Sequence, residues 1–256
     1  MTAPNTRWHG GWYRSAHRLP SPNFNARPAS IAVSLIVVHS ISLPPGQFGT
    51  GQVHKLFTNT LDWDAHPYFD AIRDLRVSSH FLIERSGALW QFVACQHRAW
   101  HAGQSSFRGR INCNDYSIGI ELEGLEGGPF EPAQYETLTT LCTHIAGAYP
   151  ITAIAGHEHV APGRKHDPGA GFDWAGFQRR LGWPPDRFAN GQPTRAERGR
   201  CDRSGVMTEW DCDKAKAEIE QYLHNELCAA DAVDIRKHMA ECPECAGEAQ
   251  VGQILT

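Results

Sequence analysis

The residues best suited to chemistry lie in one short stretch between Gly156 and Gly169. Three histidines, a lysine and an aspartate stand there among glycines and prolines: His157, His159, Lys165, His166 and Asp167. Two imidazoles and one carboxylate form a ligand set that leaves a position open on a catalytic Zn²⁺. Because glycine and proline interrupt the stretch, we expect a loop rather than a helix. In an extended chain alternate side chains share a side, which favours His157 and Asp167 as ligands, with Lys165 beside Asp167.

The loop is one ligand short, and a histidine at the end of a buried strand would complete the set. His39 follows the apolar run Leu35–Val38 and precedes a polar turn. A histidine in such a position is more often simply hydrogen-bonded, so the prediction for His39 depends on the loop as well. The alternatives are histidines that could instead be structural or face a substrate: His80, His101, His159 and His166.

Composition places the chain among soluble globular proteins. Of its 256 residues 41% are hydrophobic and 20% charged, with a net charge of −4. That balance lacks the basic excess of a nucleic-acid binder. The sequence shows no apolar run of membrane-spanning length and no signal-peptide core. We therefore expect a cytoplasmic protein that binds neither nucleic acid nor membrane.

Charge and cysteine both change near residue 200. Residues 201–256 hold 5 basic and 12 acidic side chains, and five of the eight cysteines. A cysteine cluster in a reducing compartment favours metal binding or redox sensing. The pattern predicts an enzymatic domain at 1–183, a linker at 184–206 rich in proline, glycine and arginine, and a small helical segment at 207–256.

Apolar periodicity predicts alternating strands and helices in the first domain. The expected strands are 32–39, a hairpin of 77–84 with 88–94, and 116–123; 98–103 is a strand or loop. The expected helices are 51–59, 66–73, 131–149 and 172–181, whereas 1–30 reads as an irregular arm. Strands separated by helices, with a hairpin among them, predict an α/β fold with one mixed sheet flanked by helices.

The strand at 116–123 has the clearest alternation. Ile118, Ile120 and Leu122 share one face, and Glu121 and Glu123 lie on the other. That second face is small and acidic, as the floor of a substrate groove would be. Both glutamates are candidates for an acid/base group.

Five stretches, at 37–46, 76–80, 98–103, 113–124 and 156–169, carry a resemblance to a known family. Residues 10–183 resemble the AmpD-type N-acetylmuramoyl-L-alanine amidases of cell-wall recycling, whose fold is shared with peptidoglycan-recognition proteins. The resemblance implies zinc ligands at His39, His157 and Asp167. It implies Glu121, rather than Glu123, as the acid/base group. It also implies Lys165 as the group that stabilises the transition state.

This assignment agrees with amide chemistry. Zinc lowers the pKa of bound water to about 7 and polarises a carbonyl, and a nearby carboxylate can carry the proton to the leaving amine. Around the sugar and the peptide carboxylates of a muropeptide we place Arg76, Trp100, His101 and Arg110, since arginine binds carboxylates and a tryptophan face suits an anhydro-sugar. One departure is Ser40, where close relatives usually have asparagine.

The tail holds a second candidate metal site. His238 and Cys242 are four residues apart, on one face of a helix, and Cys242 and Cys245 form a C-x₂-C turn. With Cys212 they could close a structural zinc site. Residues 207–256 resemble a truncated zinc-binding anti-sigma domain, which implies a possible sigma-factor partner.

These patterns predict a cytoplasmic zinc amidase that cleaves the bond between the lactyl group of (1,6-anhydro-)N-acetylmuramic acid and L-alanine. One alternative is a recognition module that binds muropeptides without cleaving them. Another is a redox-responsive regulator that binds a sigma factor through the tail.

Overall fold

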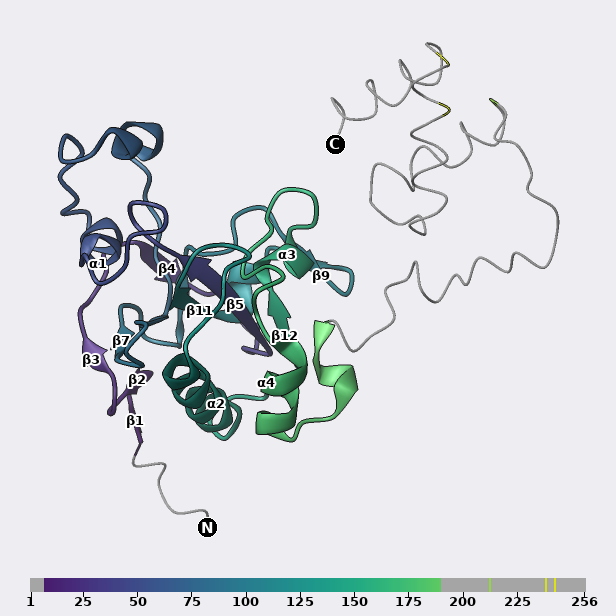
Figure 1. Cartoon of the computed structure of the whole chain (residues 1–256). Helices are drawn as coiled ribbons and strands as arrows, with labels where there is room; N and C mark the ends of the chain where they lie inside the picture. Colours follow the sequence, from purple (N-terminus) through teal and green to yellow (C-terminus); the bar gives the residue numbers. More distant parts are fainter. Residues whose placement is uncertain (1–6, 190–211, 213–237, 239–241, 243–256) are drawn as a thin grey trace. The chain divides into compact units, whose positions relative to one another are not determined.

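The computed structural model describes residues 7–189 together with Cys212, His238 and Cys242 (Figure 1). The chain divides into two compact units, residues 1–191 and 192–256. Among the described residues, no helix has the length and apolar character needed to cross a membrane.

A six-stranded mixed sheet forms the centre of the first unit. Its order is β12-β5-β11-β6-β7-β3, with β12 at Ala153–Gly156, β5 at Leu35–Ile41, β11 at Ser117–Glu123, β6 at Phe81–Ile83, β7 at Leu89–Gln91 and β3 at His17–Arg18. The first four strands in this order are mutually parallel, β7 is antiparallel to β6, and β3 is parallel to β7. The predicted α/β fold with a mixed sheet is confirmed.

Two helices cover one face of the sheet, α2 at Pro132–Ala146 and α4 at Trp174–Leu181 (Figure 1). Proline stands in the first turn of α2, where its missing N–H costs nothing. The apolar side chains of β5, β11 and β12 pack against these helices in one core, which includes Ile36, Val38, Ile118, Ile120, Leu138, Leu141, Ile154 and Phe177. The apolar residues that alternate along β11 thus lie on the face of the sheet that the helices bury.

Short elements and loops cover the opposite face. They are β4 at Phe24–Ala26 paired with β8 at His97–Ala99, β9 at Ser106–Phe107 paired with β10 at Arg110–Ile111, η2 at Cys113–Asp115, and α3 at His157–Val160. Beyond the end of β5 lies a further lobe with α1 at Gln52–Phe57 and η1 at Pro67–Ile72. Phe57 and Phe69 of this lobe pack in one apolar cluster with Leu82 of β6 and with Phe92, which follows β7.

The structure corrects four expectations. Residues 7–30 are not an irregular arm: β1 at Trp8–His9 and β2 at Trp12–Tyr13 form a hairpin, and β3 joins the main sheet. Strand β12 was not predicted. His157–Val160 is a short helix rather than a loop, because its histidine at the third position caps the first turn. The first unit extends past residue 183 through η3 at Pro185–Arg187, because Phe188 is fully buried in the core and bridges to β12. The rest of the predicted linker and the tail helices lie outside the described residues.

Candidate zinc amidase site

Three adjacent parallel strands bring the candidate residues to one edge of the sheet. His39 on β5 is the register partner of Glu121 on β11, so both side chains lie on the same face. On the other side of β5, Gly156 of β12 pairs with Val38, so His157 follows at the level of His39. This is the carboxyl edge of the parallel strands, where open α/β sheets bind ligands.

The predicted ligand set is brought together in space. The ligand atoms of His39, His157 and Asp167 all lie within 4.8 Å of one another, and the three residues are buried. Nδ1 of His39 is 3.0 Å from Nδ1 of His157 and 3.3 Å from Oδ2 of Asp167. Nδ1 of His157 is 3.1 Å from Oδ1 of Asp167.

The far ring nitrogens determine which atoms the histidines can offer. Nε2 of His157 lies 3.2 Å from the carbonyl oxygen of Ala102. A carbonyl only accepts, so Nε2 carries a proton, and Nδ1 is the nitrogen of His157 that remains to bind a metal. Burial, reinforced by the neighbouring His157, lowers the pKa of His39 to about 4, so this ring is neutral at neutral pH.

This donor set fits a tetrahedral zinc ion. Zinc–nitrogen and zinc–oxygen bonds of about 2.0–2.1 Å at tetrahedral angles separate the ligand atoms by about 3.3 Å. The distances observed between the three ligand atoms are close to that value. Two imidazole nitrogens facing each other at 3.0 Å are both satisfied when a cation lies between them.

Glu121 places a further carboxyl group close to the three ligands. Its Oε1 is 4.0 Å from Nδ1 of His39, and its buried Oε2 has no hydrogen-bond partner among the described residues. Burial, together with the negative charge of Asp167, raises the pKa of Glu121 well above its usual value, and Lys165 opposes this shift. A carboxyl group with a raised pKa suits the transfer of a proton near neutral pH.

Glu123, the other candidate on β11, is engaged elsewhere. Its Oε1 accepts from the backbone N–H of Gly49 at 2.5 Å, and its Oε2 from that of Arg85 at 3.2 Å. Its carboxylate therefore ties the loop after β5 to the β6–β7 hairpin. The contacts favour Glu121 over Glu123 as the reactive group.

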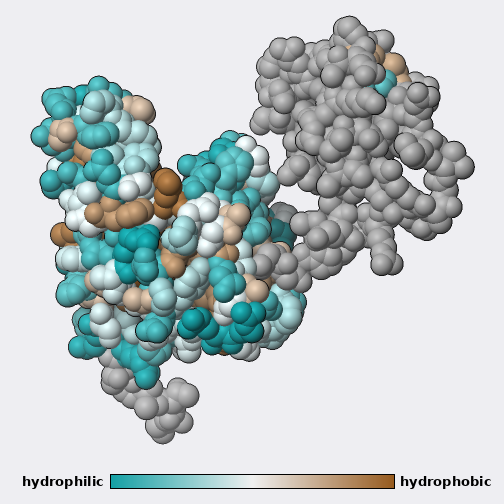
Figure 2. Space-filling view, in the orientation of Figure 1, coloured by the Kyte–Doolittle hydropathy of each residue, from teal (hydrophilic) through white to brown (hydrophobic). Residues whose placement is uncertain are grey.

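A cleft of about 410 Å³ opens over these residues. Its walls come from the segment that carries α1 and η1, from residues 124–126 and from the loop that follows α3. Figure 2 shows a hollow between two raised parts of this surface, with hydrophobic residues gathered beside it. Exposed Lys165 lines the cleft together with Glu121. The cleft thus places a cationic side chain beside the candidate ligands.

The four predicted substrate residues divide into two pairs. Trp100 and His101 line the cleft. Trp100 donates from its indole to Oδ1 of Asn25 at 2.8 Å. Arg76 and Arg110 are exposed and are not among the residues lining it. Arg110 instead lies 3.8 Å from the centre of the Tyr116 ring. For the arginines the structure gives no direct support.

The alternative histidines have other partners. Nδ1 of His80 accepts from the N–H of Gly119 at 3.0 Å, and its Nε2 donates to the carbonyl of His97 at 3.0 Å. Nδ1 of His159 accepts from the N–H of Gly156 at 2.8 Å. His166 is exposed. The first two therefore stabilise local structure.

Sequence reasoning missed two supporting residues. The guanidinium of Arg27, which is half-buried, donates to the carbonyls of Cys95, Asn114, Asp115 and Ser117. Oδ1 of Asn114 accepts from the N–H groups of His101 and Ala102 at 3.2 and 2.8 Å. These bonds fix the segment beneath the ligands, and the matched stretch at 113–124 was the available signal for Asn114.

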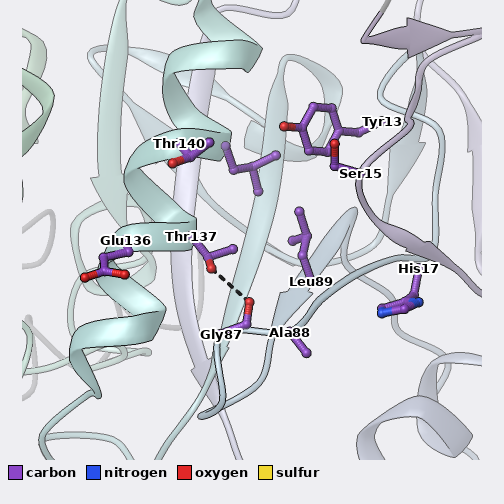
Figure 3. Close-up of a pocket in the computed structure, with 10 residues that line it drawn as sticks. Tyr13, Ser15, His17, Gly87, Ala88, Leu89, Glu136, Thr137 and Thr140 are labelled. Atoms are coloured by element: carbon purple, nitrogen blue, oxygen red, sulfur yellow. Dashed lines mark hydrogen bonds between the residues drawn. The ribbon is translucent and has the colours of Figure 1, made fainter.

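A second hollow of about 430 Å³ lies between α2, β2 and the β6–β7 hairpin (Figure 3). Its lining includes Tyr13, Glu136, Thr137 and Thr140. The hydroxyl of Thr137 donates to the carbonyl of Gly87 at 2.8 Å, as Figure 3 shows. Predicted site residues do not line this hollow.

In the second unit, Cys212, His238 and Cys242 bring ligand atoms within 4.8 Å of one another. The two sulfur atoms are 3.6 Å apart. The predicted fourth ligand, Cys245, lies outside the described residues. So do Cys201 and Cys228, two further cysteines to which the sequence assigns no role.

Comparison with known proteins supplies the deciding observation. The profile of a family described as N-acetylmuramoyl-L-alanine amidase matches residues 29–170, more than half of the chain. The chain belongs to this family. The amidase is 51% identical over 170 residues to the 1,6-anhydro-N-acetylmuramyl-L-alanine amidase AmpD of Citrobacter freundii, covering 66% of this chain and 91% of that protein. It is 49% identical to AmpD of Escherichia coli, covering 66% and 93%.

Solved structures agree with this assignment. The amidase superimposes on a crystal structure of a selenomethionine AmpD derivative with a TM-score of 0.66 and 49% identity, over 68% of this chain and 98% of that one. A second profile, described as a putative zinc-finger, matches residues 212–246. The resemblances read from the sequence to the amidases and to a zinc-binding tail are therefore confirmed.

Proposed function

We propose that the chain hydrolyses the amide between the lactyl group of 1,6-anhydro-N-acetylmuramic acid and L-alanine, in the cytoplasm, as part of cell-wall recycling. The observation that carries the proposal is the convergence of His39, His157 and Asp167 beside Glu121 at the floor of a cleft. Identity near 50% to enzymes named for the anhydro substrate supports that substrate.

We assign the cofactor role to Zn²⁺ held by His39, His157 and Asp167. When bound, zinc polarises the amide carbonyl and activates water as a nucleophile. Glu121 takes the proton of the attacking water and returns it to the leaving amine. Its raised pKa allows this, as does its Oε2, which has no hydrogen-bond partner in the described part of the chain. The ammonium of Lys165, which lines the same cleft, would stabilise the oxygen that becomes negative in the transition state.

Trp100 contributes a wall of the cleft, and its indole is held by Asn25. An aromatic face of this kind packs against a sugar ring. Arg76 and Arg110 are exposed and do not line the cleft. Their contact with the peptide carboxylates of the substrate is a proposal from the sequence. His101 lines the cleft but also contacts His39.

The test uses the full chain, an anhydromuropeptide and the variant Glu121→Gln. The wild-type protein should release peptide with a free N-terminal alanine, and a chelator should abolish the release. Glu121→Gln should retain zinc and lose turnover. Binding of the muropeptide without cleavage by the zinc-loaded wild-type protein would instead support a recognition module.

For the second unit we propose a structural zinc held by Cys212, His238 and Cys242, with Cys245 as fourth ligand. Zinc–sulfur bonds of about 2.3 Å place two thiolates about 3.8 Å apart, and the observed 3.6 Å supports this. Metal analysis should give two zinc ions per chain and one in Cys242→Ser. The matching zinc-finger profile names no partner, so binding of a sigma factor stays a hypothesis from the sequence.

A further inference from the structure

His101 lies between the candidate ligand His39 and the strand β11. Its Nδ1 is 2.8 Å from Nε2 of His39, and its Nε2 is 3.0 Å from the hydroxyl oxygen of Ser117. All three side chains are buried. Both ring nitrogens of His101 are therefore engaged inside the protein, which leaves neither free for a substrate in the cleft.

The direction of these hydrogen bonds follows from the chemistry of His39. For His39 to present a lone pair at Nδ1, its proton must be on Nε2. His101 must then accept at Nδ1 and carry its own proton on Nε2, which it donates to the hydroxyl of Ser117. The row His39–His101–Ser117 thus selects one tautomer of each ring.

The ring of His101 packs closely against the backbone of β11 at Gly119. A Cβ atom added at Gly119 would lie 2.5 Å from Cγ of His101, so only glycine leaves room for the imidazole. From the other side, Asn114 accepts from the backbone N–H groups of His101 and Ala102. The carbonyl of Ala102 in turn accepts from Nε2 of His157. One short segment therefore orients both histidine ligands, by a side chain in one case and a carbonyl in the other.

We propose that His101 is a positioning residue that fixes the ring plane and tautomer of His39, with Ser117 and Gly119 holding His101 in place. This proposal rests on the zinc site of the proposed function and replaces the substrate-contact role expected for His101 from the sequence. Partners of this kind on a metal-bound histidine typically change metal affinity by about 10- to 100-fold. A neutral imidazole, unlike a carboxylate, adds no negative charge to the site.

The experiment measures zinc affinity of the full chain by competition with a chromophoric chelator. His101→Phe keeps a ring but removes the acceptor, so it should weaken zinc binding by about 10- to 100-fold. His101→Asn, whose Oδ1 can stand where Nδ1 does, should restore most of the affinity. Ser117→Ala should weaken binding less than His101→Phe. The variant His39→Ala, which retains only the proposed second zinc site, supplies the baseline to subtract.

Steady-state kinetics on the zinc-saturated variants provide the second readout. In His101→Asn we expect KM for the anhydromuropeptide to stay near the wild-type value, and any change in kcat to accompany the change in zinc affinity. An unchanged zinc affinity in His101→Phe with a raised KM would overturn the proposal and restore the substrate-contact role. If His101→Phe does not fold, tight zinc binding by His101→Asn and weakened binding by Ser117→Ala support it, and the reverse pattern overturns it. A wild-type chain that binds zinc no better than His39→Ala would contradict the proposed catalytic metal site itself.

Discussion

The two hollows of the first unit have nearly the same volume, about 410 and 430 Å³, but their chemistry differs. The cleft contains buried groups whose lone pairs converge, and Oε2 of Glu121 lacks a hydrogen-bond partner among the described residues. In the hollow of Figure 3, Thr137 is already bonded to Gly87, and Glu136 is exposed to solvent. Volume alone therefore does not identify a reactive site.

The difference arises from where each hollow meets the sheet. The cleft lies at the carboxyl ends of β12, β5 and β11, where parallel strands deliver side chains from distant parts of the sequence to one place. The other hollow lies beside α2 and the β6–β7 hairpin, where the hydroxyl of Thr137 already donates to the carbonyl of Gly87. Buried polar groups left without partners are costly, and their accumulation in one place indicates a function.

The largest difference between the two hollows should appear when one metal ligand is removed. Asp167→Ala removes one of three ligand atoms, so the chain should lose the first zinc and essentially all amidase activity. Glu136→Ala removes one carboxylate from the other hollow and should leave both unchanged. Metal analysis and a peptide-release assay measure these effects. Full activity of Asp167→Ala at micromolar zinc would contradict the assigned ligand set.

Loss of Lys165, which lines the cleft, should have the next largest effect on turnover. Lys165→Met should reduce kcat by about 10²- to 10³-fold, as loss of one donor to a developing oxyanion does, while the zinc content stays at the wild-type level. Lys55→Met, on the exposed side of α1, is the matched control for loss of a lysine. A raised KM with an unchanged kcat would show that Lys165 binds substrate rather than stabilising the transition state.

The two glutamates of β11 offer a comparison within the cleft. Glu123→Gln replaces one acceptor oxygen with an amide group, so one of the backbone N–H groups of Gly49 and Arg85 loses its acceptor. This should cost about 1–3 kcal/mol of unfolding free energy and change turnover far less than Glu121→Gln does. Urea denaturation and kinetics report the two quantities separately. A Glu123→Gln protein of wild-type stability and negligible turnover would reverse the assignment.

Sequence pattern was sufficient where an element is long or a residue type is rare. The apolar runs before His39 and around Glu121 predicted β5 and β11, and the composition of the 156–169 loop singled out His157 and Asp167. Strand β12 was missed because it is four residues of alanine, isoleucine and glycine with no alternation. The supporting roles of Arg27 and His101 depend on contacts with residues more than 50 positions away, which no local pattern contains.

The buried His80 should also make the unfolding free energy of the protein sensitive to acid. Burial, with Arg27 nearby, lowers the pKa of His80 well below its usual value. Below about pH 6.5 the unfolded chain takes up a proton that folded His80 does not, so the unfolding free energy falls as pH falls, by at most about 1.4 kcal/mol per pH unit for this group. His80→Gln should therefore be less stable at pH 7.5 but show a smaller decrease toward pH 5.5, measured by urea denaturation of the metal-free protein.

The variant Thr137→Val is the control for His80→Gln. It tests whether the pH dependence of the stability of His80→Gln comes from the titration of His80 or from the loss of a hydrogen bond. It removes the bond from Thr137 to the carbonyl of Gly87 in the other hollow and introduces no change in a titratable group. Its cost, about 1 kcal/mol, should be the same at both pH values, and its amidase activity should match that of the wild-type protein. If His80→Gln also loses equal stability at pH 7.5 and 5.5, the pKa of His80 is the same in the folded and unfolded states, and the acid sensitivity has its origin in other groups.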